Sequence, residues 1–103
     1  MNNKRRKDIY LIIKTLLSMI QNNIVNKDAL TRLLIDIEYI QNEEEDYRDN
    51  IPENMQSGYR YERADEACDN LSYAYDYISE AIDSENCVDY LKKAIDYLND
   101  ASI

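Results

Sequence analysis

Carboxylates are the only abundant chemically active side chains in this sequence. Its 103 residues include 21 Asp and Glu, 12 Lys and Arg, and no His. Paired carboxylates can hydrolyse glycosidic bonds or hold hard metal ions when they converge in a pocket. Here they recur in long rows with the spacing of an outward helix face, and no stretch has the alternating acids and central Gly of a calcium loop. We therefore expect no catalytic residues, no metal and no cofactor.

The residue types that are missing exclude most other chemistry. Without His, the chain lacks imidazole acid–base catalysis, Ser–His and Cys–His nucleophiles and most zinc sites. A single glycine, Gly58, excludes glycine-rich phosphate-binding loops. One Gly and one Pro also leave too few turn residues for a β fold. The sequence predicts an all-α protein that is not an enzyme.

Aspartates recur at heptad spacing in the C-terminal half of the chain, at Asp69, Asp76 and Asp83. Each follows an alanine by two residues, which in a helix is a rotation of about 200°, so these acids lie opposite the Ala, Leu and Ile seam. Tyrosines near the only Pro and Gly add side chains that are common in protein interfaces. The predicted partner-binding residues are Tyr59, Tyr61, Glu62, Asp65, Glu66, Asp69, Asp76, Glu80 and Asp83.

The charge is distributed unevenly along the chain. Residues 1–32 contain seven basic and two acidic side chains, whereas residues 33–103 contain five basic and nineteen acidic ones. An elongated acidic surface can occupy a groove built for nucleic acid, because the same electrostatics steer phosphate backbones. The basic run Lys4–Lys7 could instead contact nucleic acid, but it accompanies a chain with a net charge of −9. We expect a protein partner, and neither nucleic acid nor a membrane.

Helical spacing predicts a small antiparallel bundle of three to four helices in a single domain, 1–103. Asn22 and Asn23 indicate a helix end, and Asn26 a helix cap. Ile51 is restricted by Pro52, which ends the second helix. The seam formed by Ala67, Leu71, Ala74, Ile78 and Ala81 favours a coiled-coil-like C-terminal hairpin or kinked helix. The expected helices span residues 4–21, 27–48, 59–83 and 86–101, and the connector spans residues 49–58.

Two details of these helices depend on local patterns. Ala81 and Cys87 are six residues apart where the repeat requires seven, so the chain either breaks near Ser84–Asn86 or continues as a kinked helix. We favour the break, with Ser84 as a cap. Glu43–Asp46 places four acids near a helix C-terminus, where they oppose the helix macrodipole. We expect the helix to fray there.

The first helix is apolar on most of its circumference, so it lies between several neighbours or in a subunit interface. A homodimer is one expected consequence. Its basic start imitates a signal peptide, but Lys14 interrupts the apolar stretch, and about 12 residues are too few to span a bilayer. Cys68 and Cys87 have no companion ligands and are expected to be reduced, in a cytoplasmic protein.

Several stretches resemble a family of short, acidic helical proteins encoded by phages and integrative elements of Gram-positive bacteria. The likeness covers about residues 43–84, with a weaker echo at the N-terminus. It includes Asn50–Ser57, Arg60–Ala64 and the Ala-x-Asp-x-Ile/Leu heptads. The stretch Asn22–Arg32 and the interruption at Glu85 depart from the family pattern. The resemblance implies a mobile-element origin and a helical hairpin, and it transfers no activity.

Three functions remain open from the sequence. The first is a non-enzymatic acidic binding protein that blocks a host nucleic-acid-handling or defence protein, in the manner of an anti-CRISPR or DNA mimic. The second is a structural or adaptor protein that assembles through the helical seam. The third is a DNA-binding regulator that uses the basic first helix.

Overall fold

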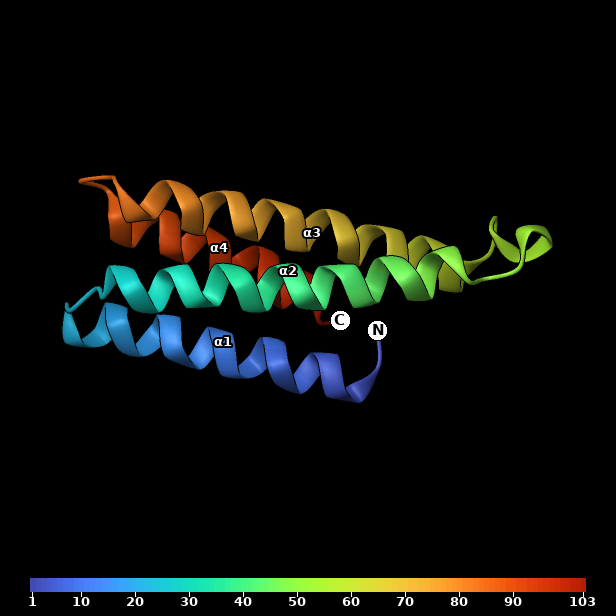
Figure 1. Cartoon of the computed structure of the whole chain (residues 1–103), viewed down its shortest axis with the longest axis horizontal. Helices are drawn as coiled ribbons and strands as arrows, with labels where there is room; N and C mark the ends of the chain where they lie inside the picture. Colours follow the sequence, from blue (N-terminus) through green and yellow to red (C-terminus); the bar gives the residue numbers. More distant parts are fainter.

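Four antiparallel helices form the bundle, which contains no strands; the computed structural model describes all 103 residues (Figure 1). The helices are α1 (Asn3–Asn22), α2 (Lys27–Asp49), α3 (Tyr59–Ile82) and α4 (Cys87–Ala101). A short 3-10 helix, η1 (Glu53–Met55), lies in the connector between α2 and α3. The all-α bundle expected from the sequence is confirmed, and each helix end lies within one residue of its predicted position. No helix is long and apolar enough to cross a membrane.

The helix ends follow from short polar signals. α1 stops at Asn22 because Asn23 adopts a left-handed conformation, with φ of 51°. The Asn26 side chain accepts a hydrogen bond of 3.0 Å from the Ala29 amide and so caps α2. Between α3 and α4 the Ser84 hydroxyl accepts from the Asn86 amide at 3.0 Å. The chain breaks at Ser84–Asn86 and turns back as a hairpin, as the repeat predicted. The prediction that Ser84 caps α4 is wrong, because the N-cap is Asn86, which makes no side-chain cap bond.

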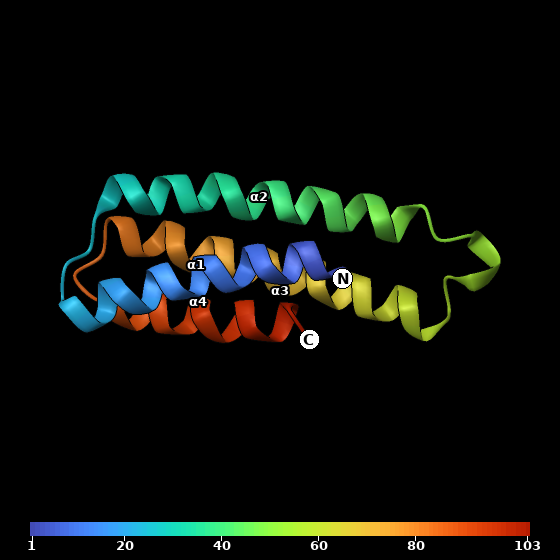
Figure 2. The same cartoon turned by 90° about the horizontal axis from the view of Figure 1, so that it is seen from below.

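α3 packs against α2 and α4. α1 lies diagonally across the bundle from α3 and packs on the same two helices (Figures 1 and 2). The expected seam of α3 is buried against these neighbours. Its alanines permit close helix approach, and its Leu and Ile fill the core. The large, fully buried aliphatic side chains are Ile9, Leu16, Leu30, Ile37, Ile40, Leu71, Ile78, Leu91 and Leu98.

The α2–α3 hairpin is longer than the rest of the bundle. The start of α1 and the end of α4 lie part of the way along it, and the hairpin continues to a tip formed by η1 (Figure 1). The molecule is accordingly elongated, with extents of 48 × 22 × 18 Å. This difference in length leaves one side of the hairpin without a covering helix near the tip.

Tyrosines join α3 to α4 along one edge. The ring of Tyr97 lies 5.2 Å from that of Tyr73 and 5.6 Å from that of Tyr77, measured between centroids. Tyr90 follows at 6.1 Å from Tyr77. The alternation of rings from the two helices forms a ladder with separations typical of favourable aromatic pairs. Three of these tyrosines are half-buried, and only Tyr73 is exposed.

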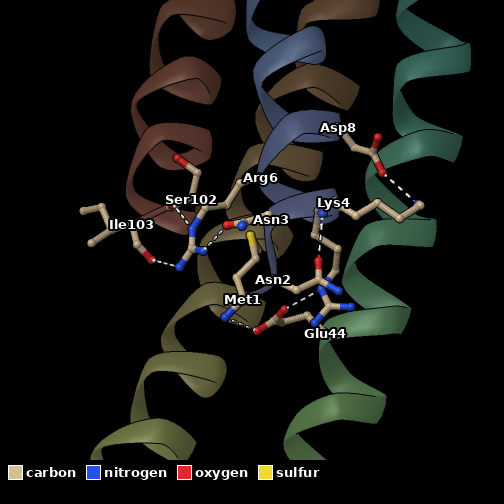
Figure 3. A network of polar contacts seen from close by, with 10 residues as sticks. Met1, Asn2, Asn3, Lys4, Arg6, Asp8, Glu44, Ser102 and Ile103 are labelled. Atoms are coloured by element: carbon tan, nitrogen blue, oxygen red, sulfur yellow. Dashed lines mark hydrogen bonds and ion pairs between the residues drawn. The ribbon is translucent and has the colours of Figure 1, made fainter.

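The prediction that α2 frays at Glu43–Asp46 is wrong. α2 continues through this run to Asp49, and Glu44 is 0% exposed. Glu44 Oε2 accepts a 2.8 Å hydrogen bond from Arg5 Nε, and the amino group of Met1 lies 3.3 Å from Oε1 (Figure 3). A buried carboxylate with a charged partner holds α1 against α2. This specific contact outweighs the unfavourable macrodipole interaction expected for the run.

The side chains of the basic run Lys4–Lys7 make separate contacts with different parts of the chain. Arg5 is buried against Glu44, and Lys4 pairs with Asp8 at 3.1 Å, which raises the pKa of Lys4. Arg6 donates to the main-chain oxygens of Ser102 and Ile103, at 3.0 and 3.4 Å (Figure 3). A cation at these carbonyls stabilises the C-terminal end of α4. Lys7 is the one residue of this run without a hydrogen bond or an ion pair.

Replacing Glu44 with Gln should lower the free energy of unfolding by about 3–5 kcal/mol, because the change leaves the Arg5 charge buried without its partner. Urea unfolding followed by circular dichroism measures the loss. Asp46→Asn is the matched control: it removes the same charge from the exposed side of α2 and should change stability by less than about 0.5 kcal/mol.

A double variant separates charge pairing from side-chain packing. In an N-terminally acetylated chain, which lacks the Met1 charge beside Glu44, Glu44→Met with Arg5→Met removes the two remaining charges and keeps much of the volume, so it should recover most of the stability that Glu44→Gln loses. A double variant that is as unstable as Glu44→Gln would contradict the assignment of the loss to an uncompensated buried charge.

Candidate functional site

The acids of α3 share one outer face of the helix. At about 100° per residue, the seven acids from Glu62 to Asp83 fall within an arc of about 100°, opposite the buried seam. Asp65 alone has an ion-pair partner, because its Oδ1 accepts a 3.0 Å hydrogen bond from Arg48 of α2. The other predicted acids are exposed and have no ion pair: Glu62, Glu66, Asp69, Asp76, Glu80 and Asp83. We call all seven the acidic face.

The charge density of the acidic face approaches that of a nucleic-acid strand. The 22 residues from Glu62 to the C-cap Asp83 rise about 32 Å along the helix axis, which places about one carboxylate per 5 Å. One strand of B-DNA carries one phosphate charge per about 3.4 Å of its axis. The spacing is shorter than the screening length of about 8 Å at physiological salt, so the separate fields merge.

The two predicted contact tyrosines do not lie on the same side of α3. Tyr59 is 71% exposed, and its ring lies 5.3 Å from the guanidinium carbon of Arg63. Tyr61 is half-buried and lies about 200° away around the helix. Tyr59 is thus accessible to a partner at the start of α3, while Tyr61 faces away from it.

Sequence reasoning left Tyr73 out of the site, although it lies among the acids. It is 50% exposed and is four residues after Asp69 and three before Asp76. This spacing puts its ring on the acidic face, between two carboxylates. The available signal was the gap in the acid row at this position, which an aromatic side chain fills.

A shallow hollow extends the acidic face toward α2. It is lined by Glu38, Gln41 and Asn42 of α2 and by Ser72 and Tyr75 of α3, with a volume of about 330 Å³. Glu38 is exposed at this edge. A partner that covers α3 therefore meets a further carboxylate and two amide groups on the neighbouring helix.

An apolar groove lies on the other side of the molecule, between α1 and α2. Its volume is about 440 Å³, and its lining includes Leu11 of α1 with Ile35 and Tyr39 of α2. Leu11 is 60% and Ile35 63% exposed. The bundle thus covers only part of the apolar surface that the sequence predicts for the first helix. Asp8 and Asp36 are the acids of the groove.

Neither cysteine is in an activating environment, and no three acids or cysteines are close enough together to hold a metal ion. Burial raises the pKa of the Cys68 thiol to about 12, although the nearby Arg48 guanidinium opposes the shift. Burial also raises the pKa of Cys87, which is half-exposed. Both thiols are free in the structure.

Thiol–disulfide exchange at pH 8 should distinguish the two thiols. With a pKa of about 12, only about one Cys68 in 10⁴ is a thiolate at this pH, and it is also buried, so Cys87 should react first. Titration with a chromogenic disulfide should give one fast equivalent in the folded protein and two in urea. Two fast equivalents without denaturant would contradict the burial of Cys68.

Comparison with known proteins adds no relative: no protein-family model, curated protein or solved structure matches this chain. A proposal for the function therefore rests on the acidic face, the apolar groove and the charges of the chain itself.

Proposed function

We propose that this chain is a non-enzymatic binding protein that presents the acidic face to a basic, nucleic-acid-binding surface of a partner protein. The observation that supports this most strongly is the row of six exposed carboxylates on one helix face without an ion pair. Their density is close to that of a phosphate backbone, so the face can compete with DNA for such a surface.

Helix stability does not account for the acidic face. Like charges four residues apart destabilise a helix by about 0.2–0.5 kcal/mol per pair, and α3 contains three such pairs: Glu62–Glu66, Asp65–Asp69 and Asp76–Glu80. A mixed surface of acids and bases would keep the protein in solution without this local cost. Recognition of a basic partner would account for the clustering of these acids on one face of α3.

The partner we propose is a host protein that handles nucleic acid or defends against mobile elements. The mobile-element origin implied by the sequence resemblance supports this choice, because inhibition of such a protein benefits the element. Mimicry of DNA is the proposed mode. The exposed rings of Tyr59 and Tyr73 would add contact area within or beside the charged row.

The triple variant Asp69→Asn, Asp76→Asn, Glu80→Gln tests the proposed function. Immobilised wild-type chain should retain DNA-binding proteins from a nuclease-treated Gram-positive lysate, and both added duplex DNA and high salt should release them. The triple variant should retain at least tenfold less of these proteins, measured by quantitative mass spectrometry.

The matched control is Asp89→Asn, Asp96→Asn, Asp100→Asn, which removes three exposed acids from α4 and keeps the acidic face. It should retain the same proteins as the wild type. Equal losses in both triple variants, or retained proteins that duplex DNA does not release, would contradict the proposal.

A second proposal concerns assembly. The α3 seam expected to drive self-association is buried within one chain, so it offers no surface to another copy. The apolar groove leaves Leu11, Ile35 and Tyr39 exposed instead. The lining is apolar on both walls, with one acid on each, Asp8 of α1 and Asp36 of α2. A second copy that packs the same groove against this one would bury these apolar side chains on both chains.

Light scattering across a range of concentrations tests the homodimer. The wild type should have twice the chain mass of 12.2 kDa, and Leu11→Ser with Ile35→Ser should be monomeric with unchanged helix content. The control Tyr73→Ser changes an exposed ring on the acidic face and should remain dimeric. A wild type that stays monomeric at high concentration would exclude this proposal and leave the first unaffected.

A further inference from the structure

An arginine-rich cleft lies where the ends of α1 and α4 meet the longer α2–α3 hairpin. It has a volume of about 350 Å³, and its lining includes Arg6, Arg60 and Arg63 with the rings of Tyr47 and Tyr59. No carboxylate side chain lines it. The cleft exists because the hairpin continues past the neighbouring helix ends, which leaves this side of α3 uncovered (Figure 1).

None of the 21 Asp and Glu side chains forms an ion pair with an arginine of this cleft. Arg6 is occupied by the main-chain oxygens of Ser102 and Ile103 and by Asn3. Arg63 uses one nitrogen to donate to the Tyr59 hydroxyl, and Arg60 makes no hydrogen bond. A guanidinium has five N–H donors, so Arg60 and Arg63 have donors free for a ligand.

A second hollow adjoins the first at the connector. It has a volume of about 520 Å³ and shares Tyr47, Tyr59 and Arg60 with the arginine-rich cleft. The side chains of Asn50, Asn54 and Ser57 also line it, again without a carboxylate. Amides and hydroxyls provide both donors and acceptors, and the tyrosine rings provide flat apolar surfaces. These are the groups that bind the edge and the face of a nucleobase.

We propose that the two hollows together bind a nucleotide, with its phosphate on Arg60 and Arg63 and its base in the connector hollow against Tyr59. Arginine is suited to the phosphate because its planar fork donates two parallel hydrogen bonds. A carboxylate ligand would satisfy the arginines equally well, but it would leave the amide and aromatic lining of the second hollow unused. The nucleotide accounts for both hollows.

The net charge of −9 does not prevent anion binding at this site. Glu62 is separated from Arg60 by about 160° around α3, so the helix body lies between them. A helix with its side chains is about 10–12 Å thick, and at physiological salt charges are screened beyond about 8 Å. Glu66 lies one turn after Arg63, outside the cleft lining, and weakens the positive field at Arg63, so the position beside Arg60 is the more favourable one for an anion.

Calorimetry on the full chain at 0.15 M salt tests the proposal with AMP and with inorganic phosphate as separate probes. Arg60→Gln with Arg63→Gln should weaken AMP binding at least tenfold, because it removes charge-assisted hydrogen bonds. Lys7→Gln with Lys92→Gln removes the same charge from exposed sites elsewhere and should change AMP affinity less than twofold.

Tyr59 variants test the position of the base. Tyr59→Leu should weaken AMP binding about fivefold or more beyond its effect on phosphate binding, whereas Tyr59→Phe, which keeps the ring and removes only the hydroxyl that accepts from Arg63, should change AMP and phosphate binding by the same factor. A single-stranded octanucleotide distinguishes a nucleic-acid strand from a free nucleotide as the ligand. If the octanucleotide binds at least tenfold tighter than AMP, the site is assigned to a nucleic-acid strand. If it falls short of this tenfold difference, the site is assigned to a free nucleotide. Both results require sensitivity to the arginine variant.

Three outcomes would overturn the nucleotide assignment. The first is no binding of AMP or the octanucleotide at millimolar concentration. The second is an equal loss of affinity in the arginine variant and in the lysine control. The third is an acidic peptide that binds as tightly as AMP and with the same variant dependence. None of these outcomes bears on the acidic face, because its residues do not line either hollow.

Discussion

The helical period of α3 separates two incompatible kinds of side chain on one element. The alanines, Leu71 and Ile78 lie on one side and are buried by α2 and α4. A shift of the helix by one position would rotate it by about 100° and bring carboxylates toward the core, where uncompensated charges cost several kcal/mol each. Burial of the seam thus determines both the bundle and the outward direction of the acids, from which the proposed function follows.

Much of this architecture is predictable from the sequence because the residues that begin or end each helix lie within a few positions of that helix end. Asn23, Asn26 and Pro52 mark helix ends within a few residues, each through its own backbone or side-chain preference. The acidic face is predictable from the seven-residue spacing of its acids, because side chains opposite an apolar, buried seam face solvent. Among its acids, only Asp65 has an ion-pair partner, Arg48, which lies on another helix.

The features missed by the sequence depend on contacts between distant residues or on relative helix lengths. Arg5 and Glu44 are 39 positions apart, and each lies within a run of like charges, Lys4–Lys7 and Glu43–Asp46, that gives no sign of a distant partner. The tyrosine ladder requires the register of α3 against α4. The arginine-rich cleft exists because α4, with 15 residues, is shorter than α3, with 24. Periodicity on a single helix contains none of this information.

The central claim is that the carboxylates of α3 face outward and serve recognition, so the fold does not need them. The free energy of unfolding of the variant Asp69→Asn, Asp76→Asn, Glu80→Gln, measured by urea titration at low and high salt, tests this most directly. We expect stability equal to or above that of the wild type, with the gain largest at low salt, because the variant relieves repulsion between like charges. A loss of more than about 1 kcal/mol would show that these acids hold the bundle together, and would contradict the account.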